Sequence, residues 1–528
     1  MPELSRVDHS SSPPTIDIPR SYNAAVDLIG RNLAAGRGDK TAFIDDRDRC
    51  TYAELDRRTA ACANALVALG LQREQRLLMC VHDGIDFPTV FLGAIKAGIV
   101  PVAVNTLLTQ GDYEYMVRDS RARVVVVSAA LLPLFQPLLD RVPTLERIVV
   151  SGGTGPDSLA VLLDAQPGEC EIADTTRDDI CFWLYSSGST GLPKGTTHIH
   201  SSLIYTAELY GRPILGIRED DVVFSAAKLF FAYGLGNSLT FPMSVGATAV
   251  LMAERPTPAA VGRRLREYRP NIFYGVPTLF AAMLASGDLP AREHVSLRLC
   301  ASAGEALPEE IGRRWRAHFG VDILDGIGST EMLHIFLSNR TGDVRYGTTG
   351  TPVPGYEVRL TDDDGHEVGI GEVGELQVRG PSSSAGYWNN RSKTCQTFLG
   401  EWTRSGDKYS INADGYYVYS GRTDDMLKVN GIYVSPIEVE SVLVTHEAVL
   451  EAAVVGQADE DELVKPKAYV VLKPGIRAGD DLAAELKAHV KSLLAPYKYP
   501  RWFEFVDELP KTATGKIQRF KLRALSRR

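Results

Sequence analysis

The 528-residue sequence lacks the features that would mark a membrane, secreted or zinc-binding protein. Its longest apolar stretch, residues 124–139, is interrupted by one Ser, one Gln and two Pro residues, so we interpret it as a buried strand and loop rather than a membrane span. The seven cysteines are odd in number and form no CxxC pair, which argues against a disulfide framework or a zinc site and favours a reducing cytoplasm. Residues 1–19 are polar, contain no signal-peptide pattern and are predicted to be a loose arm.

The sequence also lacks an excess of positive charge. Lys and Arg number 57 against 66 Asp and Glu, so the net charge is -9 and general nucleic-acid binding is not expected. The hydrophobic fraction of 44% and the charged fraction of 23% are typical of a globular protein. The length predicts three or four domain-sized units, at roughly 150 residues each.

Short apolar runs alternate with helical patterns, which predicts an α/β fold. Expected strands lie at residues 76–80, 100–104, 124–127 and 148–150, with a helix at 91–97. Residues 51–54 match a capping box, and Gly70 is expected to end the helix that follows. The short strand-like runs with Gly and Pro turns in residues 347–379 predict a more β-rich unit. The last hundred residues are predicted to form a small α+β domain, with strands at 452–455 and 467–472 and a helix at 481–494.

A Gly/Ser/Thr-rich segment follows a strand-like run at residues 180–185. It reads Ser186-Ser187-Gly188-Ser189-Thr190-Gly191-Leu192-Pro193-Lys194-Gly195. Glycines let backbone N–H groups approach an anion, the hydroxyls add donors and the lysine adds charge, which together suit a polyphosphate. The segment does not match the Walker pattern G-x-x-x-x-G-K-[ST]. The alternative interpretation is a flexible surface loop.

This segment resembles the phosphate-binding loop of the adenylate-forming family, which includes acyl-CoA and aryl-CoA synthetases, luciferases and peptide-synthetase adenylation domains. Seven further segments resemble family motifs in the same order, at residues 91–98, 302–305, 325–331, 404–407, 421–425, 428–431 and 511–516. The resemblance implies a large N-terminal α/β domain with a β-rich subdomain over residues 1–423. It implies a small mobile α+β C-terminal domain over residues 424–528.

The resemblance implies an ATP- and Mg²⁺-dependent activation of a carboxylic acid to an acyl-adenylate, followed by transfer to coenzyme A. The implied catalytic residues are Thr190, Glu331 and Lys516. Thr330 would contact the AMP phosphate, Glu331 would hold Mg²⁺ and Asp407 would bind the ribose hydroxyls. The other implied ATP-binding residues are Ser186, Ser187, Gly188, Ser189, Gly191, Lys194, Ala303, Gly304, Glu305, Asp325, Gly326, Ile327, Arg422 and Lys428. The family usually has an adenine-stacking tyrosine where this sequence has Ile327, so an aliphatic side chain would cover the adenine ring here.

Four of these roles have a structural alternative. Glu331 would also suit the N-terminus of a helix, and Asp407 an Asx-turn. Lys516 lies in a basic, Gly/Thr-rich C-terminal segment that would also suit a solvated tail. The resemblance makes Asp424 the hinge between the domains and Gly431 a coenzyme A contact, whereas Asp424 would otherwise be an ordinary turn residue.

Two segments are expected to line the acid site, and they resemble those of benzoate-CoA ligases. Their substrate-binding residues would be Phe231, Ala232, Tyr233, Gly328, Leu333 and His334, whose rings and small side chains suit a flat, apolar, small aromatic acid. His334 would either sense the ring or cap a neighbouring carbonyl. Three alternatives remain: a 4-hydroxybenzoate- or aminobenzoate-CoA ligase, a stand-alone adenylation enzyme loading a carrier protein, and a non-catalytic nucleotide-binding sensor. No membrane partner is expected, and a homodimer is one option for the assembly.

Overall fold

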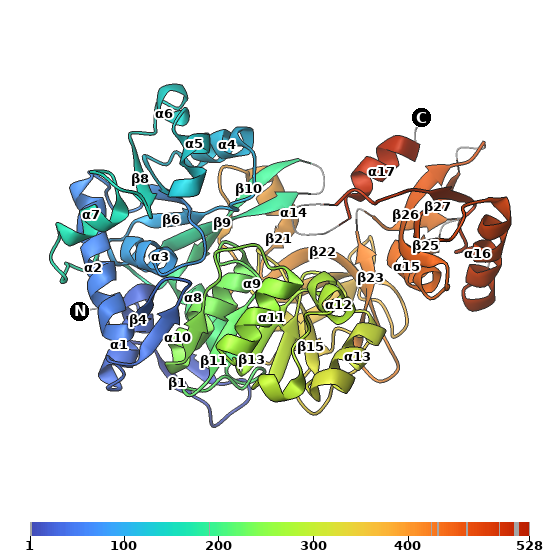
Figure 1. Ribbon diagram of the computed structural model, residues 1–528, viewed down its shortest axis with the longest axis horizontal. Coiled ribbons are helices and arrows are strands. Elements are labelled where there is room, and N and C mark those ends of the chain that lie inside the picture. Colours follow the sequence, from blue (N-terminus) through green and yellow to red (C-terminus); the bar gives the residue numbers. More distant parts are fainter. Residues whose placement is uncertain are drawn as a thin grey trace. The chain divides into compact units, whose positions relative to one another are not determined.

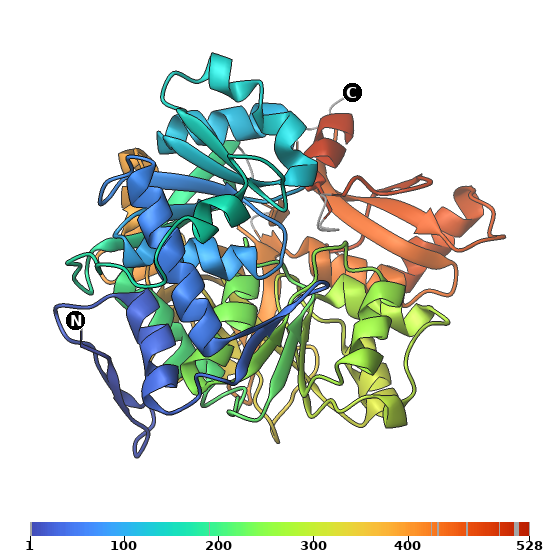
Figure 2. The same ribbon diagram turned by 60° about the vertical axis from the view of Figure 1, so that its left-hand side comes forward.

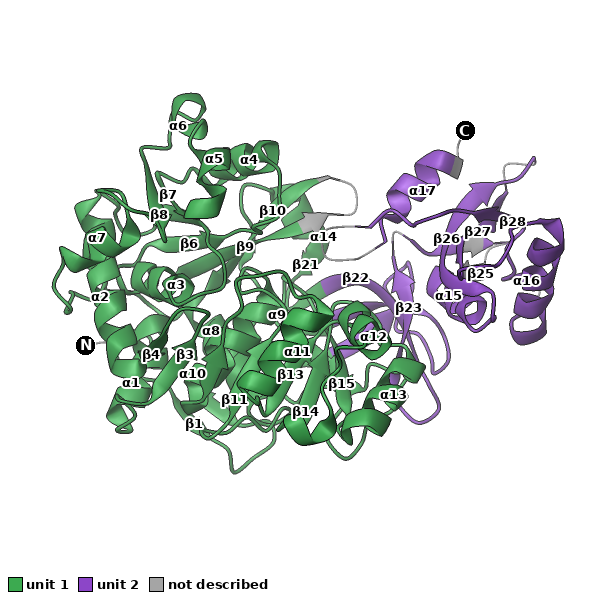
Figure 3. Cartoon of the chain, in the orientation of Figure 1, with its two compact units in different colours: residues 1–357, 378–403 green, residues 358–377, 404–528 purple. Residues whose placement is uncertain are grey.

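The computed structural model describes residues 3–188, 191–423, 425–429, 432–460, 463–495, 497–511 and 517–526. The chain forms two compact units, shown in Figure 3. Unit 1 comprises residues 1–357 and 378–403, and unit 2 comprises residues 358–377 and 404–528. The predicted α/β class is confirmed. The predicted domain boundary after residue 423 stays a prediction, and the segment 404–423 clusters with unit 2.

Unit 1 is built on two large sheets. In the described residues, the first has the strand order β20-β10-β9-β6-β5-β7-β8, which begins with β20 (Gly386–Tyr387), β10 (Gly191–Ile199) and β9 (Ile180–Gly188). Its parallel strands are β5 (Arg76–Cys80), β6 (Val100–Ala103), β7 (Val124–Ser128) and β8 (Arg147–Ser151). Helices α2 (Tyr52–Ala68), α3 (Asp86–Lys96) and α4 (Gln110–Ser120) belong to the same layered region, as Figures 1 and 2 show. The strands predicted at these positions are confirmed.

Helix α2 begins and ends where its sequence predicts. The Thr51 hydroxyl accepts from the Glu54 backbone, and the Glu54 carboxylate accepts from the Thr51 backbone, which completes the capping box. Gly70 has a φ of 87°, which favours glycine just after the helix end. A Cβ at Gly93 on α3 would lie 2.7 Å from the Cys62 Cβ on α2. The close approach of these two helices therefore requires glycine at position 93.

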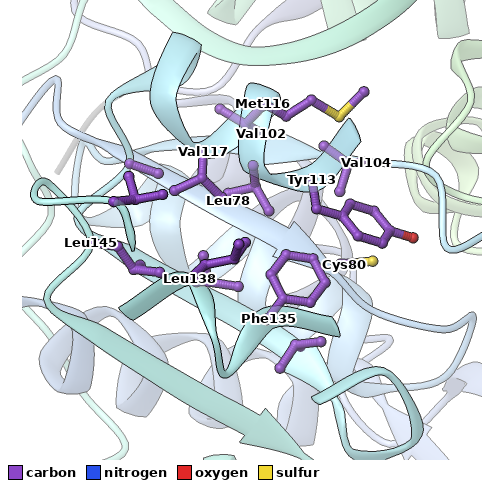
Figure 4. Packing of buried hydrophobic residues seen from close by; sticks show 14 of the residues in the cluster. Leu78, Cys80, Val102, Val104, Tyr113, Met116, Val117, Phe135, Leu138 and Leu145 are labelled. Atoms are coloured by element: carbon purple, nitrogen blue, oxygen red, sulfur yellow. The ribbon is translucent and has the colours of Figure 1, made fainter. Parts of the chain in front are cut away.

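The apolar core under this sheet is continuous. Figure 4 shows side chains from the strands and helices packed together, among them Leu78, Tyr113, Val117 and Phe135. The Tyr113 and Phe135 ring centroids lie 4.5 Å apart. Phe135 lies on the short helix α5 (Leu132–Phe135), which follows η1 (Ala129–Leu131) and precedes α6 (Leu138–Arg141). The prediction of a loop after the strand at 124 was therefore wrong, because these apolar residues form short helical turns that cover the core.

The second sheet carries the segments from which the acid and adenine sites were predicted. In the described part of the chain its order is β17-β16-β15-β14-β13-β11-β12-β3-β4. The outer strands of this order are β17 (Thr351–Pro352), β16 (Ile335–Ser338), β12 (Thr248–Val250), β3 (Thr41–Ile44) and β4 (Arg49–Thr51). Strands β11 (Val222–Ser225), β13 (Ile272–Gly275), β14 (Leu299–Ser302) and β15 (Ile323–Gly328) are parallel neighbours. Segments that follow adjacent parallel strands meet at one edge of the sheet, and such edges are the usual ligand sites of α/β folds.

The N-terminal arm is a hairpin rather than the predicted loose segment. Strand β1 (Arg6–Asp8) pairs with β2 (Thr15–Asp17). Next to it, Arg31 lies 2.9 Å from Asp27 and 3.1 Å from Glu208, and both carboxylates are fully buried. The Ser5 hydroxyl donates to Asp27, and the His9 Nε2 lies 3.1 Å from Glu208. These contacts hold the arm against buried carboxylates from distant segments. The composition of residues 1–19 alone does not predict such contacts.

Unit 2 contains most of β22 (Trp402–Ile411), which pairs with β23 (Tyr417–Arg422). It also contains the sheet β26-β27-β28, whose last strand is β28 (Trp502–Phe505). Strand β26 (Val449–Ala458) pairs with β27 (Val464–Leu472), and helix α16 (Asp480–Leu493) packs on the core through Leu486 and Val490. The strands and helix predicted here are confirmed.

All seven cysteines lie among the described residues and are reduced. Five are buried, Cys170 is half-buried, and Cys395 is exposed on α14 (Arg391–Thr397). Burial raises the pKa of the Cys50, Cys62, Cys80 and Cys300 thiols to about 12. Within the described residues, no helix combines the length and apolar character needed to cross a bilayer.

Candidate active site

The Gly/Ser/Thr segment lies on an antiparallel hairpin of unit 1. Strand β9 (Ile180–Gly188) pairs with β10 (Gly191–Ile199), and Lys194 stands opposite Ser186. The predicted strand therefore runs further than residue 185, and most of the predicted loop is strand. The Tyr115 hydroxyl donates to the Pro193 carbonyl at 2.9 Å, which ties the hairpin to α4. The hairpin therefore places the Ser186 hydroxyl and the Lys194 ammonium on facing strands.

Glu331 lies beside this hairpin. Its Oε1 accepts from the Tyr387 hydroxyl at 2.7 Å and from the Ser186 hydroxyl at 3.3 Å. The Lys194 Nζ lies 4.6 Å from the centre of the Tyr387 ring. Tyr387 on β20 (Gly386–Tyr387) was missed by the sequence analysis. It reaches the site because β20 pairs with β10 at Thr196, a contact between distant segments that the sequence alone does not predict.

Thr330, next to Glu331, is fixed through a histidine that the sequence analysis did not single out. The His198 Nε2 lies 2.8 Å from the Thr330 carbonyl, which can only accept, so this nitrogen carries the proton. Burial lowers the pKa of His198 to about 4, so the ring is neutral at pH 7. The ring stacks on Phe182 at 5.2 Å. His198 therefore positions the 329–331 turn as a neutral hydrogen-bond donor.

The residues expected to bind ATP on its adenine side lie on one strand and directly after its neighbour. Ala303, Gly304 and Glu305 come directly after β14, while Asp325, Gly326 and Ile327 lie on β15, where Asp325 pairs with Ser302. Gly304 has a φ of 93°, so glycine suits the turn out of the strand. Burial raises the pKa of Asp325 well above its usual range. The structure thus brings these two predicted segments to one sheet edge.

The acid-site residues also gather in unit 1. Helix α9 (Ala232–Leu235) follows Phe231, and Leu333 and His334 lie between β15 and β16 (Ile335–Ser338). The His334 ring is 5.5 Å from the Tyr233 ring, and its Nε2 lies 3.2 Å from the Tyr233 carbonyl. His334 therefore does cap a carbonyl, and burial lowers its pKa to about 3. Leu333 has a φ of 66°, a strained conformation for leucine that marks this turn as constrained.

Gly328 has a structural reason to be glycine. A Cβ there would lie 2.5 Å from the His334 carbonyl oxygen and 2.8 Å from the Ile335 backbone nitrogen. The requirement for glycine thus comes from the neighbouring backbone, and it does not by itself indicate space for a ring. A substitution at Gly328 would disturb the strand as well as any ligand.

The segment before α9 is anchored by a buried acid that the sequence analysis did not identify. The Asp83 carboxylate accepts from the Leu229 backbone N–H at 3.2 Å and 3.3 Å. The Lys228 ammonium donates to the carbonyls of Met252 and Glu254. Burial raises the pKa of Asp83 to about 6, although Lys228 and the Leu229 N–H favour its charged form. An isolated Asp carries no sequence signal of this role.

This raised pKa gives a stability prediction. The folded state holds the Asp83 proton more tightly than the unfolded state, so stability falls as pH rises from about 4 through about 6. At about 1.4 kcal/mol per pKa unit, the total cost is roughly 3 kcal/mol, of which about half is added between pH 5 and pH 8. Asn at position 83 cannot ionise but can still accept from Leu229.

We therefore expect Asp83→Asn to gain about 1.5 kcal/mol relative to the unsubstituted protein between pH 5 and pH 8. Urea unfolding of both proteins at several pH values measures this difference. A difference that does not change with pH would show that Asp83 is ionised in the fold at pH 5 and contradict the prediction.

In unit 2, two of the predicted nucleotide ligands come together. The Arg422 Nη1 lies 3.0 Å from the Asp407 Oδ1, and β22 and β23 pair at these two residues. The Asp407 side chain is only 8% exposed, whereas the Arg422 side chain is 46% exposed. The Asp407 backbone N–H donates to the Ser405 hydroxyl. The pair presents a fixed carboxylate beside a solvent-accessible guanidinium.

The ends of the predicted lysine loop are joined at its base. Lys511 bridges Ile517, and the Gln518 N–H donates to the Pro510 carbonyl at 2.8 Å. Directly after the loop, Arg519 pairs with the buried Glu440 at 2.7 Å. Asp425 pairs with Arg523 at 2.7 Å and with Arg519 at 3.6 Å. Both ends of the loop are therefore tied into the folded body of unit 2.

Five predicted site residues lie outside the described residues: Ser189, Thr190, Asp424, Gly431 and Lys516. The side-chain surroundings of Ser187, Gly188, Gly191 and Lys428 are likewise outside the description. Their roles stay predictions.

Comparison with known proteins agrees with this arrangement. The family model described as AMP-binding enzyme matches residues 31–388, and the model described as AMP-binding enzyme C-terminal domain matches residues 438–516. The chain therefore belongs to the AMP-binding enzyme family.

Individual relatives within this family carry names that state a specific reaction. The chain is 71% identical over 523 residues to a Thauera aromatica protein named benzoate–CoA ligase, with 99% of each chain covered. It is 52% identical to a 4-hydroxybenzoate–CoA/benzoate–CoA ligase of Rhodopseudomonas palustris, covering 96% of this chain and 95% of the other. A crystal structure of a benzoate CoA ligase from Burkholderia xenovorans LB400 is similar at a TM-score of 0.89 and 58% identity, covering 95% of this chain and 100% of that one.

Proposed function

We propose that this chain is an AMP-forming aryl-acid CoA ligase whose preferred acid is benzoate. ATP and the acid form an acyl-adenylate and pyrophosphate, and the thiol of coenzyme A then displaces AMP to give the aryl-CoA thioester. The observation that carries the reaction class is the 71% identity to a benzoate–CoA ligase over nearly the whole of both chains. The choice of benzoate is further supported by the ring-lined turn of Tyr233, Leu333 and His334.

The residues around Glu331 fit a magnesium ion riding on ATP phosphates. Glu331 is half-buried, and among the described residues its carboxylate receives neutral hydroxyls and forms no ion pair with Lys or Arg. Mg²⁺ prefers hard oxygen ligands, and a carboxylate that forms no ion pair with Lys or Arg is suited to this role. Glu331 would hold the ion, with Ser186 nearby. When bound, the ion neutralises phosphate charge during the displacement of pyrophosphate.

The remaining roles divide between the units. In unit 1, the hairpin hydroxyls, Lys194 and Thr190 would bind phosphate, and the edge at Ala303–Glu305 would hold adenine. In unit 2, Asp407 would bind the ribose hydroxyls and Arg422 would add a positive charge. Lys516 would stabilise the charge that develops at the α-phosphate, and Gly431 would lie beside the pantetheine arm in the second step. We place this chemistry in the cytoplasm, and a homodimer is one possible assembly.

Ala232 offers the cleaner test of the acid site, because it is half-buried at the start of α9 and already carries a Cβ, whereas a Cβ at Gly328 would overlap the neighbouring backbone. We expect Ala232→Ile to lower kcat/KM for benzoate by roughly 10- to 100-fold, since overpacking costs about 1–3 kcal/mol. The KM for ATP should stay within a few-fold. Steady-state AMP release measures both constants.

The kcat/KM values for a series of carboxylic acids test the same site. Benzoate and small ring-substituted benzoates should give higher kcat/KM than hexanoate and longer chains. Unchanged benzoate kinetics in Ala232→Ile, together with a preference for long chains, would remove the aryl site from the proposal but leave the ATP chemistry. Measuring AMP release with and without coenzyme A separates the ligase from a carrier-loading enzyme, and no AMP release with any acid would favour a nucleotide sensor.

A further inference from the structure

A short segment of unit 1, residues 382–388, joins the turn that carries Glu331 to strand β10 of the phosphate hairpin, and we call it the bridging segment. On the side of the turn, the Ser384 backbone N–H donates to the Glu331 carbonyl at 2.8 Å. On the side of the hairpin, the Ser384 hydroxyl donates to the Thr197 carbonyl at 2.8 Å, and the Thr197 hydroxyl donates to the Gly386 carbonyl at 2.9 Å. The bridging segment therefore fixes the backbone at Glu331 relative to β10.

Tyr387, within the bridging segment, is held through both its backbone and its ring. Its backbone N–H donates to the Thr394 hydroxyl at 3.1 Å, and it pairs with Thr196 where β20 meets β10. The next N–H along the chain, that of Trp388, donates to the Gly195 carbonyl at 2.8 Å. The Tyr387 ring is buried, and its centre lies 5.5 Å from that of Phe398. These contacts restrict where the Tyr387 hydroxyl can lie.

This hydroxyl acts on the side chain of Glu331. It donates to the Glu331 Oε1 at 2.7 Å, and the Ser186 hydroxyl donates to the same oxygen from 3.3 Å. Among the described residues, the Glu331 Oε2 receives no hydrogen bond. A carboxylate that is held through one oxygen presents the other in a fixed direction, which is how a neighbouring group orients a metal ligand. Because the phenol is neutral, it leaves the negative charge of the carboxylate for a cation.

We propose that Tyr387 is a positioning residue whose hydroxyl orients the Glu331 carboxylate toward the Mg²⁺ carried by ATP. The proposal rests on the ATP-dependent function proposed above and adds to it a residue that sets the metal dependence of ATP binding. Loss of a group that orients a metal ligand typically lowers metal affinity by about 10- to 100-fold. The effect is limited to the metal, so ATP without Mg²⁺ binds equally well with and without this hydroxyl.

Tyr387→Phe tests the role, because it removes the hydroxyl and keeps the ring. Calorimetric titration with ATP, once in excess Mg²⁺ and once in EDTA, measures binding without an acid and without turnover. We expect the Kd for ATP in Mg²⁺ to rise about tenfold and the Kd in EDTA to stay within about twofold. When Glu331→Gln is already present, adding Tyr387→Phe should change the Kd in Mg²⁺ by less than about twofold, since the carboxylate that the hydroxyl orients is absent.

Tyr356→Phe is the matched control, because Tyr356 bonds to the same segment at a different place. Its hydroxyl lies 2.7 Å from the Ser382 hydroxyl, which in turn donates to the Met332 carbonyl at 2.8 Å. Removing the Tyr356 hydroxyl loosens the bridging segment without removing a hydrogen bond to the Glu331 carboxylate. Both Kd values should therefore remain those of the unsubstituted protein.

Three results would overturn the role of Tyr387. An equal rise of the Kd in Mg²⁺ and in EDTA would place its hydroxyl on the nucleotide rather than on the metal ligand. Unchanged Kd values in Tyr387→Phe would show that the hydroxyl has no such role, and the same rise in Tyr356→Phe would make the effect a general one of the bridging segment.

AMP release with benzoate in the unsubstituted enzyme tests the proposed function separately. If no acid is activated but Tyr387→Phe weakens ATP binding only in Mg²⁺, the proposed function fails and the role of Tyr387 stands. If benzoate is activated and Tyr387→Phe shows no such difference, only the role of Tyr387 fails.

Discussion

Replacing Lys516 with alanine should slow acyl-adenylate formation by at least about 100-fold. Removal of one preorganised group that stabilises transition-state charge typically costs two to three orders of magnitude. The joined base of the loop, with Lys511 bridging Ile517 and Arg519 held by Glu440, means that the substitution removes charge while the loop's anchors remain. Pyrophosphate exchange measures this half-reaction without coenzyme A.

The second half-reaction provides the contrast. Thioester formation from preformed aryl-adenylate and coenzyme A should fall much less, because the role proposed for Lys516 is at the α-phosphate in the first step. Lys511→Ala is the matched control, since Lys511 forms an exposed pair with Glu451 at 2.7 Å and should have little effect on either step. An equal loss in both half-reactions would make Lys516 a structural residue.

The Asp424→Pro enzyme should adenylate benzoate at close to the normal rate and lose at least about 100-fold in thioester formation. Proline fixes φ near roughly −65° and removes an N–H, so it would restrict the pivot that we propose at position 424. The residue after it, Asp425, is fixed to Arg519 and Arg523 within unit 2. Rotation of the C-terminal part would therefore be concentrated just before this anchored residue.

Rapid-quench measurement of each half-reaction distinguishes the steps. Asp424→Ala, which keeps backbone freedom, should retain both activities within a few-fold. Wild-type rates for both steps in Asp424→Pro would mean that the pivot lies elsewhere in the chain.

The parts of the fold that depend on local sequence could be predicted from it. The strand at Arg76–Cys80 and the helix at Asp480–Leu493 follow apolar periodicity, and the start of α2 follows from its capping box. The N-terminal hairpin and the short helices after β7 were missed, because each is stabilised by packing against distant segments. The β9–β10 hairpin was only half predicted, since its second strand is paired on its far side by β20.

The same distinction applies to the site. The motifs identified Ser186, Glu331, Asp407 and Arg422 by their chemical types and order. Their partners could not be identified, because Tyr387 lies 56 residues from Glu331 and His198 lies 132 residues from Thr330. Neutral positioning groups such as His198 carry no motif, and the pKa that defines their role depends on burial.

The positions of the cysteines allow two fluorophores to be attached, one to each unit, for an energy-transfer measurement. Only a thiolate reacts readily with a maleimide, so the buried thiols with raised pKa should resist labelling while Cys395 on unit 1 accepts it. Unit 2 contains no cysteine of its own. Leu493, which is 57% exposed at the end of α16, can receive one by Leu493→Cys, with Cys170→Ser removing the half-buried thiol. A fluorophore pair at 395 and 493 would then follow the separation of the two units through a single turnover.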